Sequence, residues 1–159
     1  MDNERFELFF GTLFSVLALV RKHLLVDHEA GDCANVTKAH FPLLFMVHSR
    51  GSITMTEGAK TAGLSKPHMT MQVDKLVEEG LVKRVYDPGD RRLITVRLTE
   101  KGLGFVMALK ERMRQRAWRL FGSISDEDLE KMLQTLVTLK NLMSKAEAEG
   151  TSKEEHKVG

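Results

Sequence analysis

The amino-acid sequence predicts a mainly α-helical protein with one small β-hairpin. Apolar residues recur at helical spacing along most of the 159 residues. Two runs rich in β-branched residues, 81–86 and 93–98, are separated by a short polar loop, as in a hairpin. Two short helical patterns joined by a glycine turn come directly before that hairpin. The remaining patterns are longer helices on either side of this central region.

Composition places the chain among soluble globular proteins with one compact unit. It is 42% hydrophobic and 29% charged, with a formal net charge of +2. That charge does not by itself indicate nucleic acid, since a strongly basic domain is the usual footprint. The single cysteine, Cys33, excludes an intrachain disulfide and fits a reducing, cytoplasmic location. Acidic Asp2, Glu4 and Glu7 precede a short apolar run, which argues against both a signal peptide and a membrane span.

The first predicted helix covers residues 4–26. Its apolar residues recur at helical spacing, and others widen the apolar face beyond a single stripe. A helix this apolar at a chain end has little of its own domain to cover it. We therefore expect it to be buried against a second subunit of a homodimer. Residues 27–35 have no periodicity and are predicted to form a loop.

Two capped helices are predicted next. Thr37 is suited to cap a helix that runs through Val47, with Pro42 inside its first turns. Thr54 and Glu57 have the spacing of a capping box, which predicts a short helix ending near residue 62. Glycine at position 63 then marks the turn into the following helix.

The fourth predicted helix begins after Ser65, whose hydroxyl is suited to accept from the free N–H groups of a first turn, and it ends at Gly80. One face is an apolar stripe of Met69, Val73, Leu76 and Val77. The opposite face carries Pro67, His68, Met71, Asp74 and Lys75, with Lys66, Thr70 and Gln72 on the flanks. In the hairpin that follows, Lys83, Arg84, Thr95 and Arg97 are expected to alternate with the apolar residues.

The loop of the hairpin, residues 87–92, has the sequence DPGDRR. It is too long for a two-residue turn and carries Arg91 and Arg92 at its tip. Two adjacent charges there have little value for folding alone, so we expect them to meet something outside the protein.

The order helix, turn, helix, hairpin and three sequence motifs resemble the winged helix-turn-helix of the MarR (multiple antibiotic resistance regulator) family. The motifs are GLVKR at 80–84, DPGDRR at 87–92 and LTEKG at 98–102. The resemblance implies a winged helix-turn-helix at residues 37–102 and a homodimeric, DNA-binding transcription regulator, usually a repressor. One departure is Gly58, where such domains usually have leucine, so we expect looser packing of the first helix of the motif.

The resemblance implies that the fourth helix enters the major groove of double-stranded DNA. The residues expected to contact DNA are Ser65, Lys66, Pro67, His68, Thr70, Met71, Gln72, Lys75, Arg91 and Arg92. Exposed methionine is unusual on such a face, and contact with a thymine methyl group would explain Met71. The family pattern also implies that Asp87 or Asp90 pairs with one arginine to fix the loop. The other arginine would then be free to enter the minor groove, and either one fits that role.

Two helices are predicted after the hairpin, the first from Thr99 to about Phe121. Ser125 and Asp128 form a second capping box, and the helix after it has a leucine-rich stripe close to a heptad. We expect residues 4–26 and 103–147 to form the dimer interface, and the small, charged residues 150–159 to be a disordered tail.

The family also includes regulators released by small aromatic or phenolic acids. By position, the candidate pocket residues here are Phe14, Leu17, Arg21, His40, Leu44 and Val47. The alternative is that these side chains fill the core and leave no cavity. Arg21 or Lys22 is the candidate partner for a ligand carboxylate.

Other functions find little support in the sequence. Enzyme signatures such as a Gly-rich phosphate loop, a nucleophile elbow or a His/Glu metal motif are missing, so we expect neither catalysis nor a cofactor. Cys33 lies near His28, Asp32 and His40, but the spacing matches no metal-ligand motif. The chief alternative to DNA binding is a winged-helix module for protein–protein interaction.

Overall fold

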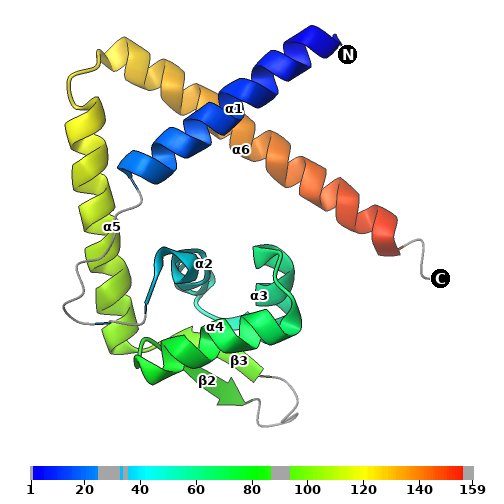
Figure 1. Ribbon diagram of the computed structural model, residues 1–159, viewed down its shortest axis with the longest axis vertical. Coiled ribbons are helices and arrows are strands. Elements are labelled where there is room, and N and C mark those ends of the chain that lie inside the picture. Colours follow the sequence, from blue (N-terminus) through cyan, green and yellow to red (C-terminus); the bar gives the residue numbers. More distant parts are fainter. Residues whose placement is uncertain (1, 25–32, 34–35, 87–93, 156–159) are drawn as a thin grey trace. The chain divides into compact units, whose positions relative to one another are not determined.

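The protein is described by a computed structural model that covers residues 2–24, 33, 36–86 and 94–155 (Figure 1). The helices are α1 (Asn3–His23), α2 (Phe41–Arg50), α3 (Met55–Ala62), α4 (Lys66–Glu78), α5 (Glu100–Phe121) and α6 (Asp126–Glu155). A single 3-10 turn, η1 (Lys38–His40), precedes α2, and the strands are β1 (Ile53–Thr54), β2 (Val82–Tyr86) and β3 (Ile94–Leu98). The mainly helical fold with a small sheet is confirmed.

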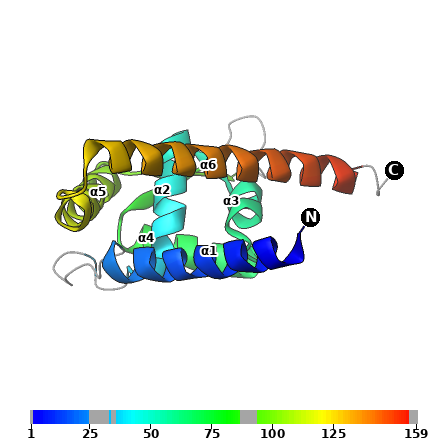
Figure 2. The ribbon, with the colours of Figure 1, turned by 90° about the horizontal axis from the view of Figure 1, so that it is seen from above.

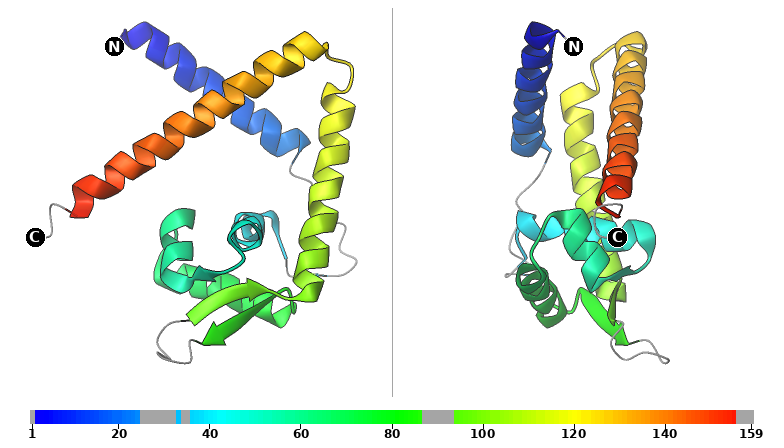
Figure 3. Two further views of the ribbon diagram at one scale, coloured as in Figure 1. Left: turned by 180° about the vertical axis from the view of Figure 1, so that it is seen from behind. Right: turned by 90° about the vertical axis from the view of Figure 1, so that its right-hand side faces the viewer.

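The chain divides into two compact units, Met1–Trp118 and Arg119–Gly159. In the first unit, the sheet lies beside α2, α3 and α4, as the views in Figure 3 show. The core between these elements contains fully buried side chains from α2, α4, the sheet and the first half of α5, and α3 adds the buried Ala59. They include Phe41, Leu44 and Val47 of α2, Met69, Val73 and Leu76 of α4, Val96 of β3, and Val106 and Leu109 of α5. The core thus holds α4 by one face.

The sheet has three antiparallel strands in the order β1-β3-β2, whereas the sequence predicted only a hairpin. Ile53 pairs with Val96, and Val82 pairs with Leu98 at the other edge of β3. A strand of two residues is too short to produce a periodic pattern, so β1 exists through its pairing with β3. It also supplies a core side chain, because only 2% of Ile53 is exposed.

The predicted helix caps are present. In α3, the Glu57 N–H donates to Thr54 Oγ1 over 3.1 Å and the Thr54 N–H donates to Glu57 Oε2 over 2.9 Å. In α6, the Asp128 N–H donates to Ser125 Oγ over 3.1 Å. These contacts satisfy N–H groups that a helix start leaves without intrahelical partners.

The helix expected from Thr37 begins later, at Phe41, after the η1 turn. The cause is Pro42, which has no N–H to donate to the carbonyl of residue 38. The Phe41 N–H bonds that carbonyl instead, in the tighter 3-10 pattern. Nδ1 of the buried His40 accepts from the Thr37 N–H over 3.0 Å and closes the turn. Burial lowers the pKa of His40, which favours this neutral, accepting form.

The hairpin and α5 are joined by a tight junction at Thr99. Its hydroxyl donates to the Gly80 carbonyl over 2.6 Å and accepts from the Gly102 N–H over 3.0 Å. Its own N–H donates to the Leu81 carbonyl over 3.0 Å. A Cβ at position 102 would overlap that same carbonyl, so only glycine fits there. The close approach of α5 to the end of α4 therefore explains two residues of the LTEKG motif, Thr99 and Gly102.

Gly58 does not loosen α3, contrary to the prediction. Gly58 and Ala59 are both buried. A Cβ at position 58 would overlap the terminal methyl of Met69 and lie 3.1 Å from Cδ1 of Ile53. Met69 is fully buried, so its flexible thioether fills the space that a leucine would otherwise take.

The terminal helices are long, and Figure 2 shows α1 and α6 each as one unbroken helix. α1 ends at His23, short of the predicted residue 26, and no residue in it is buried. α6 continues to Glu155, although residues 150–159 were predicted to be disordered. Lysine, alanine and glutamate before Gly150 and lysine and glutamate after it favour a helix, and one glycine costs only about 1 kcal/mol. Within the described residues, no helix is long and apolar enough to cross a membrane.

Replacing Gly58 with leucine should destabilise the protein, although leucine is the better helix former. Overpacking against Met69 costs about 1–3 kcal/mol, which exceeds the gain of about 1 kcal/mol in helix propensity. The midpoint of urea unfolding should therefore fall for Gly58→Leu. Met69→Ala alone should also lower the midpoint, because it opens a cavity. The double variant should recover much of both losses, and strictly additive losses would contradict this packing.

Candidate nucleic-acid interface

Helix α4 has a capped N-terminus, a buried inner face and an outer face that is open to solvent. The Ser65 hydroxyl accepts from the His68 N–H over 3.4 Å, and Pro67 occupies one of the first two helical positions. The inner stripe of the helix lies in the core. Met69, Val73 and Leu76 have no exposed surface. The outer face of α4 is therefore held in one orientation by packing on the opposite side.

Most of the residues predicted to contact DNA lie on this outer face. The exposed ones are Ser65, Lys66, Pro67, His68, Thr70, Met71 and Lys75. Gln72 is an exception, because only 7% of it is exposed. It lies three residues after Met69 and four before Leu76, which puts it in the buried stripe rather than on a flank. Val77, assigned to that stripe from the sequence, is 37% exposed instead.

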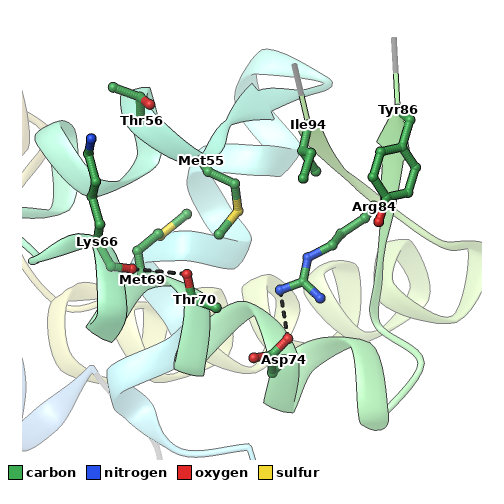
Figure 4. Close-up of a pocket in the computed structure, with 9 residues that line it drawn as sticks. All are labelled: Met55, Thr56, Lys66, Met69, Thr70, Asp74, Arg84, Tyr86 and Ile94. Carbon is green, nitrogen blue, oxygen red and sulfur yellow. Dashed lines mark hydrogen bonds and ion pairs between the residues drawn. The ribbon is translucent and has the colours of Figure 1, made fainter. Parts of the chain in front are cut away.

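An ion pair joins α4 to the sheet. Nη2 of Arg84 on β2 lies 2.6 Å from Oδ1 of Asp74 on α4, as Figure 4 shows. Only 25% of the Arg84 side chain is exposed, and 46% of that of Asp74. From the sequence, Arg84 was expected to alternate with the apolar residues of the hairpin, and its contact with Asp74 was not predicted. The signal was available, because Arg84 follows the buried Val82 by two residues and therefore lies on the same face of β2.

A cleft of about 460 Å³ lies between α4 and the strands, with the Asp74–Arg84 pair in its wall (Figure 4). It is lined by Met55, Thr56, Lys66, Met69, Thr70, Asp74, Arg84, Tyr86 and Ile94. Thr70 donates its hydroxyl hydrogen to the Lys66 carbonyl over 3.0 Å. Tyr86 and Ile94 are paired across the hairpin, so the cleft lies at the point where the wing loop begins.

Two cations face each other on the other side of the hairpin. Lys83 and Arg97 are cross-strand partners, and both are exposed. Like charges directly opposite each other destabilise an antiparallel pair. These two residues add positive charge to the wing beyond that of its tip.

The tip itself, residues 87–93, lies outside the described residues. The roles expected for Asp87, Asp90, Arg91 and Arg92 therefore remain predictions from the sequence.

The candidate effector residues fall into two groups. Leu44 and Val47 are fully buried and His40 is 4% exposed, so all three belong to the core of the first unit. Phe14, Leu17 and Arg21 are exposed on α1, as is Lys22. None of these residues lines the cleft beside α4. Leu44 and Val47 have no exposed surface, in line with the alternative that these side chains fill the core, and the effector pocket stays a prediction.

Cys33 is buried, and His28 and Asp32 lie outside the described residues. Among the side chains that the structure describes, no group of three or more His, Cys, Asp or Glu could hold a metal ion.

Comparison with known proteins supports a single family. Residues 36–94 match the model of the MarR family. Among curated relatives, the uncharacterized HTH-type transcriptional regulator YdgJ of Bacillus subtilis is 23% identical over 129 residues, which are 81% of this chain and 77% of the relative. The uncharacterized HTH-type transcriptional regulator YhbI of the same organism is 28% identical over 102 residues, 64% and 66% of the two chains.

Solved structures share the fold. A MarR family protein from Bacillus stearothermophilus aligns with a TM-score of 0.76 and 22% identity, over 91% of this chain and 99% of the other. Wild-type MarR from E. coli in its apo form aligns with a TM-score of 0.66 and 23% identity, over 81% and 94%.

The Asp74–Arg84 pair should hold the wing against α4. Asp74→Asn removes the charge with little change in shape and leaves a largely covered guanidinium without its anion. We expect a loss of about 1 kcal/mol in the free energy of unfolding, measured with urea. Glu111→Gln is the matched control, because it breaks an exposed pair with Arg114 at 2.8 Å that solvent screens. Equal losses in the two variants would contradict a special role for the Asp74–Arg84 pair.

Proposed function

This chain carries a MarR-family winged helix-turn-helix domain, and from that premise we propose that it is a homodimeric repressor that binds a palindromic operator. The observation that carries the proposal is the division of α4 into two faces. The inner face is fixed in the core, while Lys66, His68, Met71 and Lys75 are exposed on the other side. A rigid helix with short polar and basic groups exposed near its N-terminus suits the major groove of DNA.

The proposed contacts divide by chemistry. Lys66 and Lys75 are exposed cations at opposite ends of α4, and they would bind phosphates and set the register of the helix. Pro67, His68 and Met71 lie between them and would face the base edges. The wing would add Arg91 or Arg92 in the minor groove, where a narrow and strongly negative channel attracts guanidinium.

The terminal helices support the proposed homodimer. The aromatic and aliphatic residues of α1 are exposed in the single chain, including Phe6, Leu8, Phe9, Phe10, Phe14, Leu17, Leu19 and Val20. In α6, Leu129, Leu133, Leu136, Leu142 and Met143 are exposed as well. Apolar area on this scale is costly in water, and obligate interfaces resemble a core cut in half.

A two-fold dimer would place two copies of α4 on successive major grooves. The half-sites of the operator should then lie about one DNA turn apart, roughly 34 to 36 Å, because the symmetry of the protein is copied into the site. Occupation of such a site beside a promoter would block transcription, which is the repressor role proposed here. Leu44 and Val47 are buried in the core. A response to small acids like that of the family would therefore involve other residues.

Binding should weaken steeply with salt if phosphates drive it. We expect Lys66→Ala and Lys75→Ala each to reduce the slope of log affinity against log salt by about one per lost contact, hence about two per dimer. Fluorescence anisotropy with the chain's own upstream DNA would measure this. Lys110→Ala is the control, since Lys110 is exposed on α5 and should leave the slope unchanged. Absence of binding at low salt to both specific and random duplex would favour a protein–protein interaction module instead.

Dimerisation should fail when a charge enters the apolar face of α1. Leu17 is 53% exposed in the single chain, so Leu17→Glu should leave the fold intact but bury an unpaired charge in the dimer. Sedimentation at micromolar concentration should then detect monomers for this variant and dimers for the wild type. Ser15→Glu tests the polar side of the same helix and should remain dimeric. A wild-type protein that is a stable monomer would refute the proposal.

A further inference from the structure

The outer face of α4 contains an exposed thioether among polar groups. Met71 exposes 49% of its surface, next to Lys75 and His68 at helical spacing. Pro67, also exposed, lies one turn before Met71 and extends the apolar strip. An apolar strip on this face costs hydration free energy in the unbound protein and contributes nothing to the core.

Hydrogen-bond readers of bases are scarce on the same face. All of α4 is described, and its exposed side chains are Lys66, Pro67, His68, Thr70, Met71, Lys75, Val77 and Glu78. None is arginine, asparagine or glutamine, and the side chains among them that could bond a guanine are the lysines toward the two ends of the helix, Lys66 and Lys75. The glutamine of this helix, Gln72, is buried.

The two hydroxyls near the helix start are already engaged. Thr70 donates to the Lys66 carbonyl over 3.0 Å, and the Ser65 oxygen accepts from the His68 N–H over 3.4 Å. Neither hydroxyl is therefore fully available to a base edge. Between Lys66 and Lys75, the remaining exposed polar side chain is that of His68. Among the described contacts, its ring nitrogens make no hydrogen bond.

We propose that Met71 is a specificity-determining residue that reads the 5-methyl group of a thymine in each half-site. The major groove presents that methyl only at A·T pairs, so apolar contact distinguishes thymine from cytosine at the same position. This inference rests on the proposed insertion of α4 into the major groove. On this proposal, the preferred half-site has a thymine in contact with the Met71 side chain. The protein would recognise that thymine by shape and hydration rather than by paired hydrogen bonds.

Replacement of thymine by deoxyuridine tests the contact, because it removes one methyl group and leaves base pairing and protein unchanged. An operator would be selected from random duplexes, and deoxyuridine would replace thymine at one symmetric pair of positions at a time. At one pair, the wild-type protein should lose about fourfold in affinity per half-site, which corresponds to about 0.8 kcal/mol per methyl.

The protein variant completes a thermodynamic cycle. Met71→Ala should bind the thymine and deoxyuridine operators equally at that position, because the side chain that senses the methyl is gone. Met107→Ala, which alters a 55% exposed methionine on α5, should keep the wild-type discrimination. Discrimination that persists in Met71→Ala would overturn the assignment.

The outcomes test the regulator function and the role of Met71 separately. Failure of the wild-type protein to bind any duplex at low salt would overturn both the proposed regulator function and this inference. Tight operator binding without sensitivity to deoxyuridine at any position would overturn the role of Met71 and leave the regulator proposal intact.

Discussion

The close approach of α5 to the end of α4 is the constraint on which the rest of the winged domain depends. Thr99 bonds Gly80 and Leu81 on one side and Gly102 on the other, and the Leu81 carbonyl lies where a side chain at position 102 would have to be. This junction fixes where the hairpin starts and ends. β2 and β3 pair between these ends, from Val82 with Leu98 to Tyr86 with Ile94, and β1 pairs with the other edge of β3.

The same constraint positions the exposed face of α4. With its C-terminal end held at the junction and its inner stripe in the core, the helix cannot rotate without exposing Met69, Val73 and Leu76. The Asp74–Arg84 pair adds a second attachment, between the middle of α4 and the sheet. The proposed DNA-contacting surface would gain affinity from such preorganisation, because less freedom would be lost on binding.

The terminal helices differ from the winged domain, because most of their large apolar residues are exposed in the single chain. α1 has no buried residue, although it is among the most apolar segments of the sequence. Its stability therefore depends on a partner surface, which we propose to be a second copy of the chain. Folding of the winged domain and the proposed association through α1 and α6 thus depend on different residues of the sequence.

Local spacing was enough to predict the helices, their caps at Thr54, Ser65 and Ser125, and most of the exposed residues of α4, because each depends on side chains within a few positions. The three family motifs could also be recognised in the sequence, and the Thr99 junction explains the LTEKG motif. Tertiary structure alone decided the filling of the Gly58 site by Met69, the strand β1 and the pairing of Arg84 with Asp74. Each of these depends on which distant residues meet, and contact between distant residues leaves no periodic trace in a single sequence.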